Sequence, residues 1–392
     1  MEWESVMKKF KLTNEEMNVL ADRYQTPLLT VSTEKIEENY GFLRKYLPRA
    51  KVFYAMKSNP VQPILEKMAN LGASFDVASE GEIRRLSELG IAGERMIYAN
   101  PVKTIRGLQA AAEFGVNKFT FDSESEIYKM AAHVPGSKVL LRVRIDNADA
   151  IVDLNTKFGV AAEDVLRLLT IAREQGLDVA GLCFHVGSQS LSTKPYESAL
   201  ELCRRLFDEA LAAGFAMSIL DIGGGLPVPT GKRHFNLKDM AVTINRQLER
   251  LFPDTEIWAE PGRYICGTAM NLIATVISTQ ERGGRPWYVL DDGVYGTFSG
   301  VIFDHWDYEI ETYKTGSRSL STFAGPSCDS IDIICRERAV AELAIGDRVL
   351  VPDCGAYTSA SATTFNGFGL TPIVVWEEIR SSMPKLIIEA VS

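Results

Sequence analysis

The chain has 392 residues, 46% of them hydrophobic and 24% charged, and its formal net charge is −9. This length allows two or three domains, and the composition is typical of a globular protein with a sizeable core. The negative charge argues against nucleic acid or an anionic membrane as a main partner. The N-terminal residues lack the apolar segment of a signal peptide, and no apolar stretch is long enough to span a bilayer.

The six cysteines are scattered without C-x-x-C spacing, and the four histidines lie far apart in the sequence. The cysteines are therefore interpreted as reduced thiols, and no local metal motif is present. Together these features predict a cytoplasmic protein without a metal site.

Short apolar runs recur along the first two thirds of the chain and alternate with helical patterns. A polar helix is predicted at 14–24 and an apolar run follows at 27–31. Later apolar runs are found at 52–55, 73–77, 96–99, 118–121, 139–143, 179–184, 219–222 and 257–259. Helical patterns between them include 79–89, 124–132, 163–175 and 196–213.

Eight strand–helix units in series predict an α/β fold with a parallel sheet, and eight is the number that closes a (β/α)₈ barrel. A doubly wound open sheet is the alternative. After about residue 266 the pattern changes to Val-, Ile- and Tyr-rich runs with turn residues, which predicts a second, mostly antiparallel β-barrel or sandwich domain. We expect the barrel to span 33–268 and the β domain to comprise 1–32 and 269–392, because the run at 27–31 also suits the β domain.

The segment K-V-F-Y-A-M-K-S-N-P (51–60) places Lys57 just past the end of the first barrel strand. Catalytic side chains of such barrels project from the carboxyl ends of the strands. A lysine with little local charge around it could be desolvated enough to act as a nucleophilic amine. An ordinary lysine in a strand-to-helix turn is the other interpretation.

Polar residues also follow the sixth, seventh and eighth strands. They are His185 and Ser188 in F-H-V-G-S-Q, the glycines of D-I-G-G-G-L-P (221–227), and Glu260 and Arg263 in A-E-P-G-R-Y. Phosphate is frequently bound by the loops after strands seven and eight of these barrels, so the glycines and Arg263 predict a phosphate site. A simple tight turn and a structural Glu260–Arg263 pair are the alternatives, and a lone histidine is more often structural.

A lysine amine, a phosphate site and a carboxylate in one barrel mouth point to pyridoxal phosphate (PLP). Lys57 would hold the aldehyde as a Schiff base, and Glu260 would keep the ring nitrogen protonated. A protonated ring is a strong electron sink, which suits decarboxylation.

The sequence resembles the fold type III PLP-dependent decarboxylases and, within them, the ornithine and lysine decarboxylase group. The resemblance runs over nearly the whole chain. Its motifs include F-Y-A-M-K-S-N-P (53–60), F-D-V-A-S-E-G-E-I (75–83), F-H-V-G-S (184–188), L-D-I-G-G-G-L-P (220–227), A-E-P-G-R-Y (259–264), F-D-H-W (303–306), G-P-S-C-D-S (325–330) and G-A-Y-T-S-A-S-A-T-T-F-N-G-F (355–368).

The resemblance implies a role for each matching residue. Lys57 is the Schiff-base lysine, Glu260 the partner of the ring nitrogen, and His185 stacks on the ring. The cofactor and its phosphate are further held by Asp76, Arg142, Ser188, Gly224, Gly225, Arg263 and Tyr357. It also implies a homodimer with shared active sites, in which Cys328 of one subunit protonates Cα in the site of the other.

The substrate's distal end is expected to meet Asp304 and Asp329, with Tyr295 and Phe365 as further substrate residues. Two carboxylates attract an ammonium group and repel a carboxylate, which favours L-ornithine or L-lysine over diaminopimelate. These two substrates differ by one methylene, a difference worth only about 1–3 kcal/mol to a pocket. L-Ornithine decarboxylation to putrescine is expected, with lysine or dual activity as the alternative.

Two other functions remain to be weighed. A non-catalytic homologue would be expected to lose Lys57 or Cys328, and both are present. A racemase on the same barrel typically has arginine beside the ring nitrogen, where this chain has Glu260.

The polar segment 146–157 is predicted to be a mobile loop over the active site.

Overall fold

The computed structural model describes residues 9–145, 157–229 and 235–383. Contacts divide the chain into two compact units: one comprises 39–229 and 234–264, the other 1–38, 230–233 and 265–392. The predicted loop at 146–157 lies outside the described residues except for its last residue.

The first unit is a closed barrel of eight parallel strands in the order β2 to β9, so the open-sheet alternative is excluded. The strands are β2 (Ala50–Ala55), β3 (Ser74–Val77), β4 (Met96–Tyr98), β5 (Lys118–Phe121), β6 (Lys138–Arg142), β7 (Asp178–Cys183), β8 (Ile219–Asp221) and β9 (Glu256–Ala259). Pairing of Ala50 with Ile257 closes the ring.

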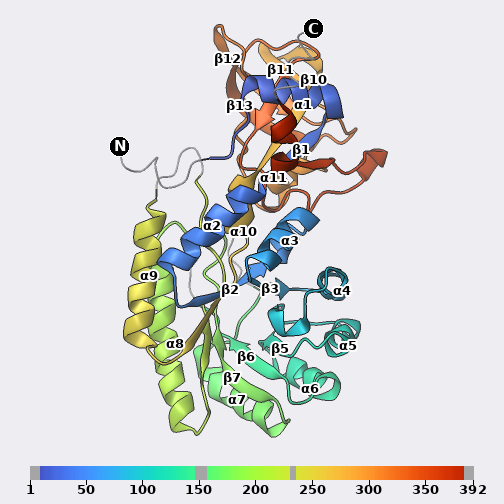
Figure 1. Cartoon of the computed structure of the whole chain (residues 1–392). Helices are drawn as coiled ribbons and strands as arrows, with labels where there is room; N and C mark the ends of the chain where they lie inside the picture. The colour runs from blue at the N-terminus through green and yellow to red at the C-terminus, as the bar shows by residue number, and fades with distance from the viewer. Residues whose placement is uncertain (1–8, 146–156, 230–234, 384–392) are drawn as a thin grey trace. The chain divides into compact units, whose positions relative to one another are not determined.

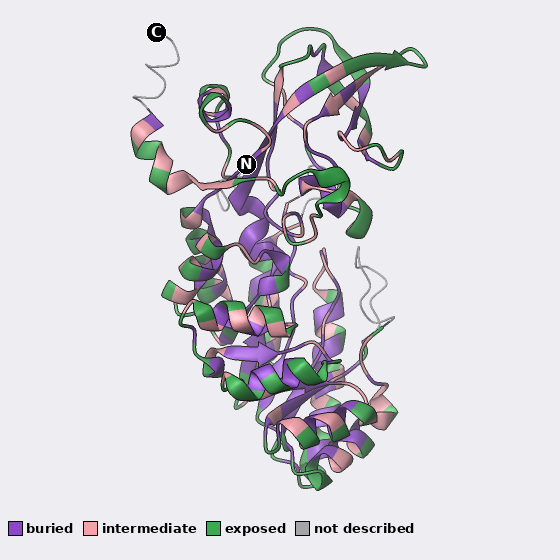
Figure 2. Ribbon diagram, turned by 90° about the vertical axis from the view of Figure 1, so that its right-hand side faces the viewer, coloured by how far each residue is buried: buried purple, intermediate pink, exposed green. Residues whose placement is uncertain are grey.

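Helices lie outside the barrel strands, one after almost every strand (Figure 1). They are α2 (Thr33–Tyr46), α3 (Gln62–Asn70), α4 (Glu80–Glu88), α5 (Ile105–Glu113), α6 (Glu124–His133), α7 (Val165–Glu174), α8 (Lys194–Ala212), α9 (Leu237–Leu251) and the short α10 (Arg263–Cys266). The strands are buried except for a few residues, mostly near their amino ends, such as Lys51, while the helices expose one face (Figure 2). This is why the strands read as continuous apolar runs and the helices as amphipathic patterns.

The barrel interior is filled by side chains from most of its strands. One buried cluster contains Phe53, Ile97, Ala99, Leu140, Ala180, Cys183, Ile219 and Trp258. The rings of Phe53 and Trp258 lie 4.9 Å apart at the centre of this packing. Burial of each such aromatic side chain stabilises the fold by roughly 1.5–3 kcal/mol, so the barrel is a solid support for the loops at its ends.

The second unit is built on a seven-stranded, mostly antiparallel sheet, as predicted. Its strands are β1 (Leu28–Val31), β10 (Met270–Arg282), β11 (Arg285–Leu290), β12 (Arg318–Ala324), β13 (Ile333–Ala341), β14 (Arg348–Val351) and β15 (Ile373–Val375). Strand β1 pairs with both β10 and β15, so the run at 27–31 belongs to this sheet. The helices of this unit are α1 (Asn14–Tyr24), α11 (Gly300–Phe303) and α12 (Trp376–Ile379).

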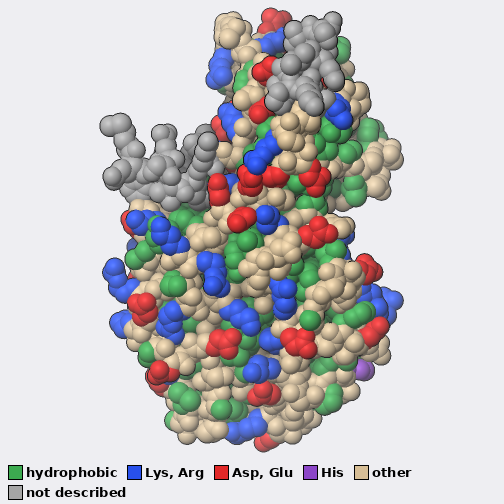
Figure 3. Space-filling model, viewed as in Figure 1, with side chains coloured by type: hydrophobic (Ala, Val, Ile, Leu, Met, Phe, Trp, Pro, Cys, Tyr) green, Lys and Arg blue, Asp and Glu red, His purple; other side chains and the backbone are tan. Residues whose placement is uncertain are grey.

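Acidic and basic side chains are interspersed on the face of the molecule seen in Figure 3.

None of the six cysteines forms a disulfide. Among the described residues, no group of histidine, cysteine and acidic side chains is arranged to hold a metal ion. A search of the same residues for a helix of the length and hydropathy needed to cross a membrane finds none.

Candidate active site

Lys57 lies in a tight turn at the carboxyl end of β2. The strand ends at Ala55, and a single 3₁₀ turn, Met56–Ser58, follows it. Ser58 donates a hydrogen bond from Oγ to the Ala55 carbonyl at 2.8 Å, and the Tyr54 hydroxyl donates to the Asn59 carbonyl at 2.9 Å. These bonds fix the backbone on either side of Lys57, so its side chain is presented at the barrel mouth.

The Lys57 ammonium forms an ion pair with Oδ2 of Asp76, which lies on the neighbouring strand β3. Asp76 is 1% exposed. Its other oxygen, Oδ1, is buried and accepts no hydrogen bond from the described residues. A buried carboxylate oxygen without a donor is costly, so this oxygen is available to a bound ligand.

His185 lies just after β7, and Arg142 is the last residue of β6. The His185 Nδ1 accepts the N–H of Gly187 at 2.9 Å, which places the imidazole proton of a neutral ring on Nε2. Burial, followed by the nearby charges of Arg142 and Lys57, holds the pKa of His185 well below its usual range. The Nε and Nη2 groups of Arg142 are buried and find no acceptor among the described residues.

The glycine turn after β8 brings backbone close to the other strand ends. A Cβ on Gly224 would come within 2.6 Å of the Glu260 carbonyl oxygen, and one on Gly225 within 2.5 Å of the Gly187 carbonyl oxygen. Gly225 also has a φ of +108°, which L side chains rarely adopt. These close approaches and the φ of Gly225 therefore require glycine at both positions.

Arg263 begins α10 and is 5% exposed. Its Nε donates a hydrogen bond to the Ser188 hydroxyl at 3.3 Å, which joins the loop after β9 to the loop after β7. A buried guanidinium beside a hydroxyl and a glycine turn is a suitable site for a phosphate group.

Glu260 follows β9 and has a carboxyl neighbour that sequence reasoning missed. Asp221, the last residue of β8, is fully buried, and its carboxyl lies within hydrogen-bond reach of that of Glu260. Burial raises the pKa of Asp221 to about 6. Burial, together with the charges of Asp221 and Asp76, raises the pKa of Glu260 well above its ordinary value.

Glu82 in the first turn of α4 is a second missed residue. Its carboxylate accepts the N–H of Ala78 at 2.6 Å. Burial raises the pKa of Glu82 to about 7, with the charge of Asp76 acting in the same direction and that of Lys57 against it. Both missed residues lie within the motifs 220–227 and 75–83. An acidic residue at the end of a buried barrel strand was the signal for Asp221.

The remaining predicted residues belong to the second unit. The Tyr295 hydroxyl donates to Oδ2 of Asp329 at 2.5 Å, and its ring stacks on Phe365 with centroids 4.2 Å apart. Cys328 is exposed, and its backbone N–H is held by the Asn366 side chain at 3.0 Å. The remaining two are Asp304, directly after α11, and Tyr357, which has a φ of 55°.

The barrel residues fit pyridoxal phosphate by their chemistry. Lys57 provides an amine and Glu260 a carboxyl group. The unpaired buried donors of Arg142, the buried guanidinium of Arg263 and the side-chain-free turn at Gly224 and Gly225 suit an anionic group. Orphaned polar atoms of this kind are expected where a ligand completes the hydrogen bonding.

Comparison with known proteins gives the same answer. Residues 33–267 match the family model of the pyridoxal-dependent decarboxylase, pyridoxal binding domain. The lysine/ornithine decarboxylase of Selenomonas ruminantium is 56% identical over 373 residues, which cover 95% of each chain.

Two solved structures extend the similarity to the whole fold. A crystal structure of SrLDC in complex with PLP and cadaverine has a TM-score of 0.93 and 53% identity, covering 98% of this chain and 99% of that one. The lysine/ornithine decarboxylase of Vibrio vulnificus, complexed with putrescine, has a TM-score of 0.87 and 34% identity, covering 93% and 99%. The chain therefore belongs to the fold type III pyridoxal-dependent decarboxylases, in the ornithine and lysine decarboxylase group, and its cofactor is pyridoxal phosphate.

Proposed function

We propose that this enzyme decarboxylates the basic amino acids L-ornithine and L-lysine to putrescine and cadaverine. The observation that carries the choice of substrate is the carboxylate of Asp329, which is held beside the Tyr295–Phe365 ring pair. The Tyr295 hydrogen bond, followed by the N–H of Ile331, lowers the pKa of Asp329, so this group stays anionic. An anion next to aromatic faces suits the terminal ammonium of either substrate.

A named relative supports dual activity. The relative that shares 56% of its residues with this chain is a lysine/ornithine decarboxylase. The two substrates differ by one methylene, for which a pocket discriminates by only about 1–3 kcal/mol. The ornithine preference expected from the sequence stays a prediction within this proposal.

The reaction consumes one proton: the amino acid loses CO₂, and Cα receives a proton in its place. Pyridoxal phosphate supplies the electron sink that stabilises the carbanion left at Cα. Lys57 supplies the amine that binds the cofactor. Glu260 would keep a proton at the ring nitrogen, and neutral His185 would contact the ring without adding charge.

Arg142, Arg263 and Ser188 bind the phosphate, and Tyr357 completes its site. Cys328 donates the proton from Sγ to Cα after CO₂ leaves. In this proposal Cys328 comes from a second copy of the chain, in a homodimer with two shared sites. The β unit exposes the apolar side chains of Phe303, Ile331, Phe368 and Leu370, which a second copy of the chain could cover.

The test is release of CO₂ and diamine from L-ornithine and L-lysine, assayed side by side with added PLP. We expect turnover of both substrates at rates within about tenfold, the range that one methylene allows. Lys57→Ala should abolish turnover, whereas Lys51→Ala, at an exposed position of the same strand, should retain it. Turnover of neither substrate by protein that binds PLP through Lys57 would show that the roles given to Asp304 and Asp329 are wrong.

A further inference from the structure

Asp221 and Glu260 are both hydrogen-bonded to the backbone of one residue, Gly223. Oδ1 of Asp221 accepts the N–H of Gly223 at 2.8 Å. The carbonyl of Gly223 in turn accepts the N–H of Glu260 at 2.8 Å. Strands β8 and β9 are neighbours in the barrel, with Asp221 paired to Trp258. The two carboxyl groups are therefore held together by the sheet and by the turn.

The second oxygen of Asp221 has no donor of its own. Oδ2 is buried and accepts no hydrogen bond from the described residues, although the Glu260 carboxyl lies within hydrogen-bond reach. A hydrogen bond between two carboxyl groups requires a proton on one of them, because neither carries a donor when ionised. Sharing one proton satisfies Oδ2 and removes one of two buried like charges.

The other charged groups around the pair do not remove the need for this proton. Asp76 adds a third negative charge, and Lys57, which is paired with Asp76, offsets only part of it. Cys183 on β7 also faces Asp221, and burial raises the pKa of its thiol well above the ordinary value, so it adds no charge. The positive charge of Arg142, at the end of β6, acts on the pKa of the Cys183 thiol in the opposite direction.

We propose that Asp221 is a positioning residue for the cofactor: it shares one proton with Glu260 in the cofactor-free site and thereby fixes the Glu260 carboxyl where the ring nitrogen binds. When the ring occupies the site, the protonated ring nitrogen takes the place of the shared proton. The O–H bond of the pair would break, and its proton would pass to the ring nitrogen if that atom enters the site unprotonated, and to solvent if it enters protonated. This inference rests on the proposed role of Glu260.

Binding of the cofactor is then coupled to the loss of one proton from the Asp221–Glu260 pair. The Asp221→Asn substitution removes this coupling. The asparagine keeps an oxygen for the Gly223 N–H and adds an amide donor toward Glu260, so Glu260 is already ionised before the cofactor binds. At neutral pH, wild type should release about one proton more per bound PLP than Asp221→Asn. Affinity for PLP should also rise with pH more steeply in wild type.

The experiment is calorimetric titration of the full-length, cofactor-free protein with PLP in buffers of different ionisation enthalpy. It counts protons during cofactor loading, so the result does not depend on which amino acid is decarboxylated. The control is Asp122→Asn, because Asp122 likewise accepts a glycine N–H, that of Gly159 at 2.9 Å, at the end of β5. The control should match wild type.

An equal proton count for wild type and Asp221→Asn would overturn the proposal. Glu260→Gln removes the shared proton and also the group that keeps the bound ring nitrogen protonated, so the two changes cancel and its proton count should equal that of wild type. If Asp221→Asn does not fold, infrared difference spectroscopy of the wild type decides: the band of a protonated carboxyl group should disappear when PLP binds, and its absence from the cofactor-free protein overturns the proposal. A fall in kcat of Asp221→Asn with an unchanged proton count would also contradict it, because a purely structural role predicts that pattern.

Discussion

The charge of His185 is set by its burial, by two neighbouring cations and by one backbone hydrogen bond. The N–H of Gly187 points at Nδ1, so a second proton on the ring would bring two donors together. Burial, with Arg142 and Lys57 nearby, lowers the pKa in the same direction. The sequence predicted the place of His185, but its neutral state follows from contacts that only the fold creates.

We expect His185 to remain neutral between about pH 8 and about pH 5, the range over which an ordinary histidine gains its charge. NMR of ring-labelled protein should show one imidazole signal that does not shift across this range and that is missing from His185→Asn. Because the unfolded chain binds this proton near pH 6.5 and the folded chain does not, His185 should lower stability as the pH falls below about 6.5. A signal with a midpoint near the ordinary value would contradict the assignment.

The strands of the barrel were predictable because each is buried on both sides and reads as an apolar run. All eight runs are strands of the closed barrel, and the change of pattern after residue 266 marks the antiparallel sheet. The polar residues at the carboxyl ends of the strands were predictable as a group, because the ends of the apolar runs mark where the strands stop. What could not be predicted is how loops pack on one another, and Lys103 is the clearest example.

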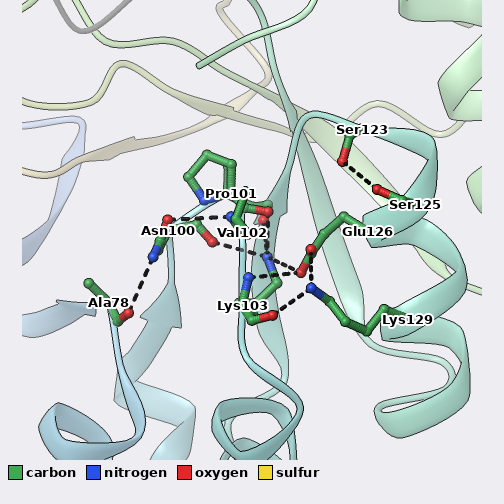
Figure 4. A network of polar contacts seen from close by, with 10 residues as sticks. Ala78, Asn100, Pro101, Val102, Lys103, Ser123, Ser125, Glu126 and Lys129 are labelled. Carbon is green, nitrogen blue, oxygen red and sulfur yellow. Dashed lines mark hydrogen bonds and ion pairs between the residues drawn. The ribbon is translucent and has the colours of Figure 1, made fainter. Parts of the chain in front are cut away.

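Lys103, in the loop after β4, reads as a surface lysine but is 2% exposed. Its ammonium donates to the carbonyls of Asn100, Pro101 and Thr120 at 3.0, 3.1 and 2.6 Å and lies 3.2 Å from Glu126 (Figure 4). Burial lowers the pKa of Lys103 to about 8, so the lysine remains charged at neutral pH. It thereby joins the ends of β4 and β5 to α6.

Glu126→Gln should destabilise the enzyme by about 3 kcal/mol, since it leaves a buried ammonium without its counter-charge. Glu124→Gln on the same helix is the matched control. Glu124 pairs with Arg167 at the exposed surface, where such pairs contribute less than about 1 kcal/mol. Equilibrium unfolding in urea compares the two variants with wild type. An equal change in the free energy of unfolding for both variants would show that the buried pair contributes no more to stability than the exposed pair.

At the scale of the whole chain, distant segments complete the β unit. Strand β1 from the beginning of the chain lies between β10 and β15 in the sheet. Near the end of the chain, Glu377 accepts hydrogen bonds from the Ser32 hydroxyl at 2.6 Å and the Thr33 N–H at 2.9 Å at the start of α2. The β unit therefore needs both segments of the chain.

Subunit mixing tests whether Lys57 and Cys328 act in one site from two copies of the chain. Lys57→Ala should be inactive, and Cys328→Ala should bind PLP but decarboxylate slowly. In a hybrid dimer, one site combines the intact Lys57 of one copy with the intact Cys328 of the other, and the second site lacks both. Random exchange at equal concentrations makes half the dimers hybrid, so activity should recover to about one quarter of wild type.

The control replaces Lys57→Ala by the double variant Lys57→Ala/Cys328→Ala. No hybrid site is then complete, so mixing the double variant with Cys328→Ala should give no recovery. Exchange of subunits is verified independently by mixing copies of different mass and weighing the intact dimers. Exchange without recovery in the first mixture would place both residues in the same copy and refute the shared site, while leaving the chemistry of Lys57 untouched.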